Sequence, residues 1–356
     1  MRPLVFQITL IAIIAAVVMS CAASATTYSP HLLGVSPGFD GSDGVGINDN
    51  GTALCWSGTI NDTSGVFTWS HGTGLVDLSR EGAVAAYGIN NQGQTVGMDK
   101  DPESGWFRPF VRNADGARTS LHLPSGVTDA WPAEINNDGQ VAMMLYYRDS
   151  DYNVTSTEVA IIGVDGSVVH VDAPSGYSEA WTLSNTGYVG MKSGNRAYVW
   201  SQAGGLSLLP QLVSGDSTAI WDVNDLGFSV GSSGDHAVMW SPNGDITDLG
   251  VGIAFGINSL RQVVGATGGR ATLWNPDGST VDLGFGESSG ASAINNHGWI
   301  VGGVSYPDPY TYQMAVLWEP VVPEPSSLLA LAGGMGCLAA VLRRKRSQAS
   351  QGQHQP

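Results

Sequence analysis

Short apolar runs separated by polar turn residues follow one another along most of the chain, and four such runs recur as a unit of about 40 residues. The unit is clearest between residues 219 and 250, where the runs cover residues 219–224, 228–231, 237–240 and 245–250. Gly, Asn, Asp and Pro stand between the runs, which is typical of β-strands joined by tight turns. Because no segment with the 3.6-residue period of a helix interrupts them, the pattern predicts a four-stranded antiparallel sheet.

The sequence predicts about seven copies of this sheet. Each copy begins with a stretch of the form Ile-Asn-Asn-x-Gly, and the copies start near Ile47, Ile89, Ile135, Leu183, Val223, Ile257 and Ile294. A four-stranded unit repeated in this way is typical of the blades of a β-propeller. The last copy reaches Pro320 before a fourth strand appears, whereas residues 28–34 end in the Leu-Gly that closes fourth strands elsewhere. We therefore expect an all-β, seven-bladed β-propeller over residues 26–320, closed by the N-terminal strand.

Two sets of repeated residues are assigned structural roles. The residue two before the repeat hydrophobic is aromatic in four copies, and period-two alternation places it on the same face as that hydrophobic. Tryptophans also recur at the ends of third strands, so we expect aromatic side chains to pack blade against blade. The repeat Asn starts a turn, where its side chain is expected to hydrogen-bond to nearby backbone. The aromatic residues are Tyr87, Trp181, Trp221, Phe255 and, at the third strands, Trp69, Trp200, Trp240, Trp274 and Trp318.

The N-terminus has the pattern of an export signal. Arg2 precedes an apolar run over residues 4–18, and Ala23 and Ala25 suit signal peptidase, which predicts a signal peptide over residues 1–25 that is cleaved after Ala25. Residues 18–21 also loosely resemble a bacterial lipobox, so lipidation of Cys21 is an open alternative. Of the three cysteines, Cys55 alone lies in the predicted exported body, so no disulfide within the body is expected.

The C-terminus carries three signals in a fixed order: Pro323-Glu324-Pro325, an apolar run over residues 328–342, and the basic residues Arg343, Arg344, Lys345 and Arg346. The run predicts a transmembrane helix with the basic residues on its cytoplasmic side. Together, residues 321–346 resemble the PEP-CTERM sorting signal of Gram-negative bacteria, and residues 347–356 add a polar tail. The alternative is an ordinary C-terminal membrane anchor.

The resemblance to PEP-CTERM proteins implies a processing partner and a destination. The partner is an exosortase-type membrane enzyme that cleaves near the motif. The protein would be held in the inner membrane by its C-terminal helix and then reach the cell surface or the extracellular matrix, in connection with exopolysaccharide production.

The repeats over residues 43–318 resemble the bacterial extracellular HAF-repeat family. That family shows an Ile-Asn-Asn-x-Gly-Gln-Val-Val-Gly core, a Phe/Leu-Trp strand and an Asp-Leu-Gly. Gln94, Gln140 and Gln262 match this core, whereas Leu183-Ser184 and Ser259-Leu260-Arg261, which lacks the turn Gly, depart from it. The resemblance implies the fold and an exported location, and it supplies no chemistry.

Composition and motifs narrow the function further. The formal net charge of -16 disfavours nucleic acid or an anionic membrane surface as a partner. The body contains no nucleophile elbow, zinc-helix or phosphate-loop motif. Glu134 and Asp222 each precede a repeat hydrophobic on the strand expected nearest the axis, which makes them candidate channel-facing residues.

Two acidic loops contain candidate ligands for Ca²⁺, namely Asp99 with Asp101 and Asp149 with Asp151. Neither loop has the full spacing of a recognised calcium loop, and a solvated acidic loop is the alternative reading. No other cofactor is predicted.

We therefore expect an exported, surface- or exopolysaccharide-associated protein that acts as a binding or structural module rather than as an enzyme. Its expected ligand is an extracellular polysaccharide or a surface protein. The alternative is a propeller hydrolase or lyase acting on extracellular glycans, with carboxylates or exposed tryptophans in the channel.

Overall fold

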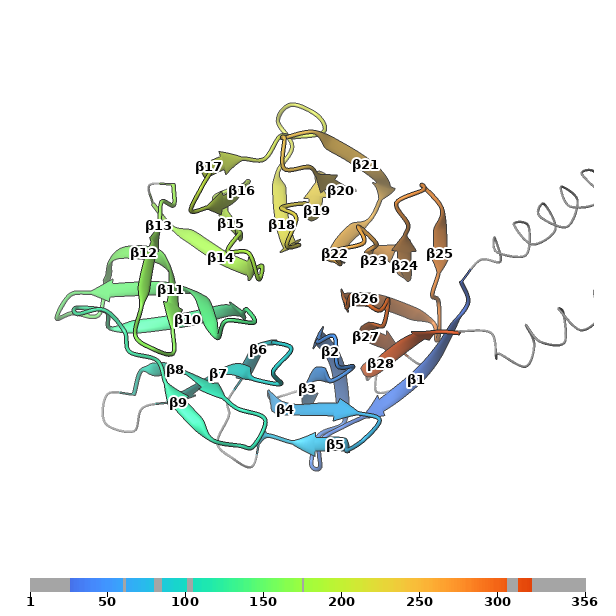
Figure 1. Ribbon diagram of the computed structural model, residues 1–356, viewed down its shortest axis with the longest axis horizontal. Helices are drawn as coiled ribbons and strands as arrows, with labels where there is room; N and C mark the ends of the chain where they lie inside the picture. The colour runs from blue at the N-terminus through green and yellow to red at the C-terminus, as the bar shows by residue number, and fades with distance from the viewer. Residues whose placement is uncertain are drawn as a thin grey trace, which may run out of the picture. The chain divides into compact units, whose positions relative to one another are not determined.

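The computed structural model describes residues 26–59, 62–79, 85–100, 105–174, 176–305 and 313–321. Within these residues the chain forms seven four-stranded antiparallel sheets. Figure 1 shows the sheets arranged in a ring around a central axis, with β2, β6, β10, β14, β18, β22 and β26 as the strands nearest this axis. The prediction of an all-β, seven-bladed β-propeller is confirmed.

The first six blades each use four consecutive strands. Blade 1 contains β2 (Gly41–Ile47), β3 (Ala53–Thr59), β4 (Asp62–Ser70) and β5 (Gly74–Asp77); blade 2 contains β6 (Ala85–Ile89), β7 (Thr95–Lys100), β8 (Phe107–Arg112) and β9 (Arg118–Ser120); blade 3 contains β10 (Asp129–Ile135), β11 (Gln140–Arg148), β12 (Val154–Gly163) and β13 (Val168–Val171). Blade 4 contains β14 (Ser178–Leu183), β15 (Val189–Ser193), β16 (Arg196–Ser201) and β17 (Gly205–Leu208); blade 5 contains β18 (Thr218–Val223), β19 (Ser229–Ser233), β20 (His236–Trp240) and β21 (Ile246–Val251); blade 6 contains β22 (Ile253–Ile257), β23 (Val263–Thr267), β24 (Arg270–Trp274) and β25 (Thr280–Asp282).

Blade 7 combines strands from both ends of the propeller. It contains β26 (Ser288–Ile294), β27 (Ile300–Ser305) and β28 (Gln313–Pro320), and its fourth strand is β1 (Tyr28–Gly34), which pairs with β28. The spare strand predicted at residues 28–34 thus completes the last blade, as expected. The ring therefore cannot open between blades 7 and 1 unless β1 leaves its own sheet.

Several predictions fall outside the described residues. They concern the signal peptide over residues 1–25 with its cleavage after Ala25, the motif Pro323-Glu324-Pro325, the helix over residues 328–342, the basic cluster Arg343-Arg344-Lys345-Arg346, and the tail over residues 347–356. Across the ranges that the structure does describe, no helix has the length and apolar composition needed to span a membrane.

Every innermost strand carries a β-bulge at the same place. Its pairing with the second strand skips one residue, and the seven skipped residues are Val45, Tyr87, Ala133, Trp181, Trp221, Phe255 and Ser292. In strict alternation, residues three apart lie on opposite faces of a strand. The extra residue breaks this alternation, so Ile220 and Val223 are both buried. The expected packing between blades holds for Tyr87. It also holds for Trp181, whose ring lies 4.8 Å from that of Trp221 in the next blade although 39% of Trp181 is exposed, and for Trp221, whose ring lies 5.5 Å from that of Phe255.

Apolar side chains fill the interfaces between neighbouring blades. One cluster joins blades 2 and 3, another joins blades 3 and 4, and a third joins blades 7 and 1 around the buried free Cys55. The third-strand tryptophans are at most 7% exposed, which confirms their predicted core role: Trp69, Trp200, Trp240, Trp274 and Trp318. Trp240 and Trp274 also donate their indole N–H to the carbonyls of Pro210 and Leu249 in the preceding blade.

Candidate functional site

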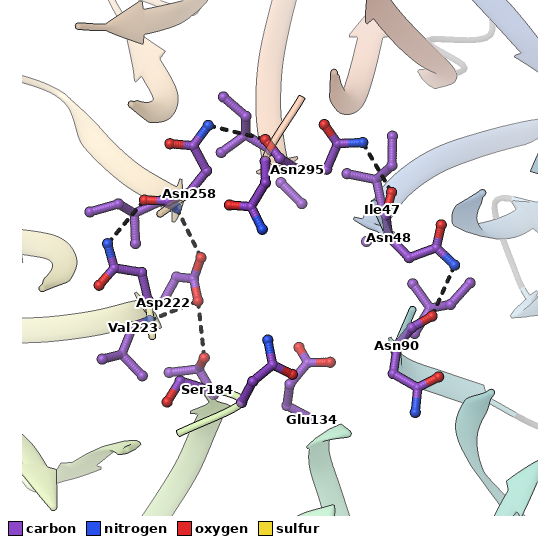
Figure 2. A pocket seen from close by; sticks show the side chains of 18 of the residues that line it. Ile47, Asn48, Asn90, Glu134, Ser184, Asp222, Val223, Asn258 and Asn295 are labelled. Atoms are coloured by element: carbon purple, nitrogen blue, oxygen red, sulfur yellow. Dashed lines mark hydrogen bonds between the residues drawn. The ribbon is translucent and has the colours of Figure 1, made fainter. Parts of the chain in front are cut away.

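The repeat asparagines form a ring of hydrogen bonds around the channel (Figure 2). In blade 1, Asn48 Oδ1 accepts from the N–H groups of Asn50 at 3.1 Å and Thr52 at 2.9 Å, and the asparagines of five other blades repeat this geometry. The predicted turn role is therefore confirmed. The side-chain amides have a second role that the sequence did not reveal, because most of them donate to the next blade.

These inter-blade bonds join the Asn side chain of one blade to the backbone carbonyl of the repeat Asn in the following blade. They run from Asn48 to Asn90, Asn90 to Asn136, Asn224 to Asn258, Asn258 to Asn295 and Asn295 back to Asn48, at 2.9–3.0 Å. The repeat asparagines are at most 5% exposed, so the bonds are shielded from water.

A second tier of bonds lies at the next position in each turn. Here a backbone N–H donates to the side-chain oxygen of the equivalent residue in the neighbouring blade, at 2.7–2.9 Å. The bonds run from Asp49 to Asn91, Asn91 to Asn137, Asn137 to Asn185, Asn185 to Asp225, Ser259 to Asn296 and Asn296 to Asp49. Between them the two tiers join all seven pairs of neighbouring blades.

The first ring is interrupted at blade 4, where Ser184 replaces the repeat Asn. The Ser184 hydroxyl accepts from the N–H of Tyr188 at 3.0 Å and contacts the Thr186 hydroxyl, and serine has no amide with which to continue the ring. Asp222 connects the blades here instead. Its Oδ1 accepts from the Thr182 hydroxyl in blade 4 and its own-strand Val223 N–H, and its Oδ2 accepts from the Ile257 N–H in blade 6.

A cavity of about 220 Å³ lies in the channel and is lined by the innermost strands of all seven blades. Glu134 and Asp222 both line it (Figure 2), together with the bulge residues Trp221 and Phe255. Its volume is below the roughly 300–1,000 Å³ of drug-sized ligand pockets, so it suits a small ligand.

Polar side chains gather on one side of this cavity. The residue before the repeat hydrophobic is Gly or Ala in blades 1, 2, 6 and 7, whereas blades 3, 4 and 5 carry Glu134, Thr182 and Asp222. The Glu134 carboxyl occupies space left by the absent side chain of Gly88, because a Cβ at Gly88 would overlap Glu134 Oε1. The interruption of the asparagine ring and the polar cluster therefore fall on the same blades.

Burial raises the pKa of both channel acids. The pKa of Glu134 rises to about 8 through burial, an effect that the Ile135 N–H opposes and the charge of Asp222 increases. Burial raises the pKa of Asp222 to about 6, although its three hydrogen bonds lower it. At pH 7 Glu134 is therefore mostly protonated, and its Oε1 accepts from the Ile135 N–H at 3.2 Å, while Asp222 is mostly ionised and accepts three hydrogen bonds.

The described carboxylates of the acidic loops, Asp99, Asp149 and Asp151, are not brought together. Asp99 Oδ2 accepts from Arg118 Nη1 at 2.9 Å, and Asp149 Oδ1 accepts from the N–H groups of Asp151 and Asn153 within its own turn. Asp101 lies outside the described residues. In the part of the chain that the structure describes, no three Asp, Glu, His or Cys side chains are grouped as metal ligands.

Sequence reasoning selected Glu134 and Asp222 and missed Thr182 and Ser184. A signal was present, because Leu183-Ser184 departs from the repeat motif in the same copy that places Thr182 beside the channel. Nothing in the sequence indicated that the Thr182 hydroxyl of blade 4 donates a hydrogen bond to the Asp222 carboxylate of blade 5.

No family model matches the chain, and no curated protein matches it. Solved structures do. A streptogramin B lyase is 11% identical with a TM-score of 0.56, over 83% of this chain and 98% of that one. A virginiamycin B lyase from Staphylococcus aureus is 9% identical with a TM-score of 0.56, over 83% and 100%.

The β-propeller domain of the Trilobed protease from Pyrococcus furiosus, described as having an open velcro topology, is 11% identical with a TM-score of 0.51, over 78% of this chain and 96% of that one. At such identities these likenesses show the propeller fold alone. The present chain differs from an open arrangement, because β1 completes its last sheet.

Proposed function

We propose that the protein is an exported binding and structural module of the cell surface or the exopolysaccharide matrix, sorted through its C-terminal PEP-CTERM-type signal. The observation that carries the non-enzymatic part of this proposal is the engagement of Asp222. This carboxylate connects blades 4, 5 and 6 at the place where the asparagine ring is interrupted.

A carboxylate with such a structural role has little capacity left for chemistry. Its two oxygens offer about four lone-pair positions, and three of these already accept hydrogen bonds. Glycoside hydrolysis in most enzymes needs two carboxyl groups, one of which acts as a base or nucleophile on substrate or water. Binding places no such demand on Asp222, so a binding module fits the channel better than a hydrolase.

Export and sorting are tested by the distribution of the protein in cells. We compare the full chain with a variant that ends at Pro320, with the triple substitution Pro323→Ala, Glu324→Ala and Pro325→Ala, and with a variant that lacks only residues 348–356. The first two should lose surface and matrix delivery, whereas the last should keep it. Equal delivery of all four chains would show that the C-terminal signal has no sorting role.

A second candidate function is hydrolysis or lysis of extracellular glycans. It is favoured by the protonated Glu134 on the cavity wall, since a carboxyl with a pKa raised to about 8 is a suitable general acid. The chain end of a glycan, rather than its middle, would have to enter so small a cavity. Turnover of a polysaccharide that is lost with Glu134→Gln and kept with Asp138→Asn, an exposed turn residue, would establish this function; full turnover by Glu134→Gln would exclude Glu134 as the acid.

A further inference from the structure

Seven side chains that do not line the central cavity come together at strand ends of blades 2, 3 and 4. These blades are neighbours in the ring (Figure 1). The group consists of aromatic residues around one arginine, and we call it the aromatic surface: Trp106, Phe107, Trp131, Tyr146, Arg148, Tyr152 and Tyr177.

Contacts link the members into one group. The rings of Trp106 and Tyr152 lie 5.6 Å apart, and the Arg148 guanidinium lies 5.0 Å from the Trp106 ring and 5.5 Å from the Tyr146 ring. The hydroxyls of Tyr146 and Tyr177 are hydrogen-bonded at 3.1 Å. The aromatic side chains are thus held in place by their neighbours.

Asp129 connects this group to a second aromatic pair. Its Oδ2 accepts from the Trp131 indole N–H at 3.4 Å and lies 3.7 Å from Arg148 Nη2. Trp131 in turn packs against Phe107, with ring centroids 5.8 Å apart. The arginine charge is therefore balanced by a carboxylate, and the Asp149 and Asp151 carboxylates of the Tyr152 turn add negative charge beside the surface.

The backbone at Tyr152 shows that this aromatic residue is held in an unfavourable conformation. Residues 149–153 form the same turn as residues 48–52: in both, the first and last residues pair, the first side chain accepts two backbone N–H groups, and the fourth N–H bonds back to the first carbonyl. The fourth position is Gly51 in the one turn and Tyr152, with φ 66°, in the other. Glycine adopts this left-handed conformation freely, whereas tyrosine does so at a cost in free energy.

That strained tyrosine is also the most exposed large side chain of the surface. Tyr152 is 67% exposed, Tyr177 53% and Trp131 37%. Tyr152 therefore combines a strained backbone with a side chain that packs on Trp106 and remains largely exposed. Backbone strain of this kind is concentrated at binding sites, where the surrounding structure holds a side chain ready for a ligand.

We propose that the aromatic surface binds a neutral polysaccharide chain, an inference that rests on the proposed function and names its ligand. Sugar rings present faces of C–H groups that pack on aromatic rings, and hydroxyl rims that need hydrogen-bond partners. Exposed Trp and Tyr side chains offer an apolar ring with a polar tip, which matches both requirements.

The charges of the protein favour a neutral ligand. The net charge of -16 repels an anionic polysaccharide, and the one cation of the surface, Arg148, is already paired with Asp129. A protein partner is a poorer match, because protein interfaces have a contiguous core depleted in charge, whereas here Asp129 and Arg148 lie among the rings. A chain ligand also suits a surface that extends over three blades.

The test uses the exported body, residues 26–320, in which all seven sheets are complete. Its migration is measured in native gels that contain a neutral β-1,4-glucan, a neutral β-1,3-glucan, galactomannan or, as the anionic comparison, alginate. We expect retardation by at least one neutral polymer and none by alginate. Tyr152→Gly and Trp131→Ala should each weaken binding at least about tenfold.

Tyr152→Gly distinguishes binding from a structural role, because it relieves backbone strain and should raise the melting temperature while it lowers affinity. Arg261→Gly is the matched control: it removes the other non-Gly residue with positive φ in the described chain and should leave binding unchanged. Leu226→Ala controls for loss of an exposed apolar side chain, since Leu226 is 54% exposed in a turn of blade 5.

Three results would overturn the proposal: no retardation by any neutral polymer, retardation that survives Tyr152→Gly and Trp131→Ala combined, or self-association of the body that Tyr152→Gly abolishes. A different result would overturn the proposed function. If the body binds a neutral polymer but the variants without the C-terminal signal still reach the matrix, the sorting proposal is wrong and the proposal for the aromatic surface is retained.

Discussion

Positions 258 and 184 form a natural pair for measuring what the asparagine ring contributes to stability. Asn258 is 3% exposed and makes four side-chain hydrogen bonds. It accepts from the N–H groups of Leu260 and Gln262 and donates to Gln262 Oε1 and to the carbonyl of Asn295. Ser184 shows what a serine keeps at this place, namely the bond from the N–H four residues later. Asn258→Ser therefore removes three bonds, and Ser184→Asn supplies two of the corresponding ones in blade 4, because Tyr188 has no amide oxygen to replace Gln262 Oε1.

The magnitude follows from the bonds that change. A buried hydrogen bond contributes about 0.5–1.5 kcal/mol net, so Asn258→Ser should lower the free energy of unfolding by about 2–4 kcal/mol. Ser184→Asn should raise it by about 1–2 kcal/mol, because its amide gains the carbonyl of Asn224 as an inter-blade acceptor. A change of 1 kcal/mol moves the melting temperature of a domain this large by about 2–4 °C, so the two variants should melt on opposite sides of the parent protein.

Urea unfolding followed by tryptophan fluorescence measures both changes, since the third-strand tryptophans are buried between blades. Calorimetry gives the melting temperatures independently. Asn243→Ser is the control, because Asn243 lies exposed in a turn of blade 5, and its effect should stay within about 0.5 kcal/mol. If Asn258→Ser changes stability no more than Asn243→Ser, the ring does not hold the blades together as argued.

The channel carboxyls and the strained turn of blade 6 give three further outcomes to measure. Asp222→Asn replaces one acceptor oxygen by an amide, so it should lower the free energy of unfolding in urea by about 2 kcal/mol; an unchanged midpoint would contradict the connection across blades 4 to 6. The pKa of Glu134 is raised from 4.5 to about 8, so the stability from its bound proton is complete below pH 4.5 and is lost as the pH rises through 8. Between pH 5 and pH 9, urea titrations should show the free energy of unfolding of the parent protein fall by about 4 kcal/mol, whereas that of Glu134→Gln should not show this fall. If the two proteins lose stability in parallel as the pH rises, the pKa of Glu134 is not raised. Arg261→Gly removes a left-handed φ of 61° and also the guanidinium that lies 5.5 Å from the Phe228 ring; it should stabilise the protein by about 1 kcal/mol in thermal melts, whereas a lower melting temperature would show that the contact with Phe228 outweighs the backbone strain.

The repeat predicted the fold because each blade is specified locally. Strand runs, turn glycines and the missing fourth strand of the last copy are all properties of neighbouring residues, and they were sufficient to predict seven blades and closure by residues 28–34. Local reasoning also selected Glu134 and Asp222, since their distance from the repeat hydrophobic marks them as part of the innermost strand.

Features that depend on contacts between repeats could not be predicted in this way. The bulge at Trp221 is an extra residue opposite its partner strand, and strict alternation contains no sign of it. The bond from Asn295 to Asn48 joins the last repeat to the first, which are 247 residues apart in the sequence. The aromatic surface draws on three blades, and its one local sign was Tyr152 at the fourth position of a turn of the type in which blade 1 has Gly51.

The direction of the asparagine bonds has a consequence for how such a molecule can be built. Each bond runs from one repeat to its successor, and the bond from Asn295 to Asn48 has the same donor, acceptor and length as the bond from Asn258 to Asn295. At the axis, therefore, the first and last repeats meet as the repeats of blades 1 and 2 or of blades 6 and 7 do, and the closure of the ring leaves no mark there. Among the described strands, closure shows at the rim, where β1 lies against β28. The junction at the axis thus needs nothing beyond the repeat itself, and the outermost strand alone is arranged differently in the last blade.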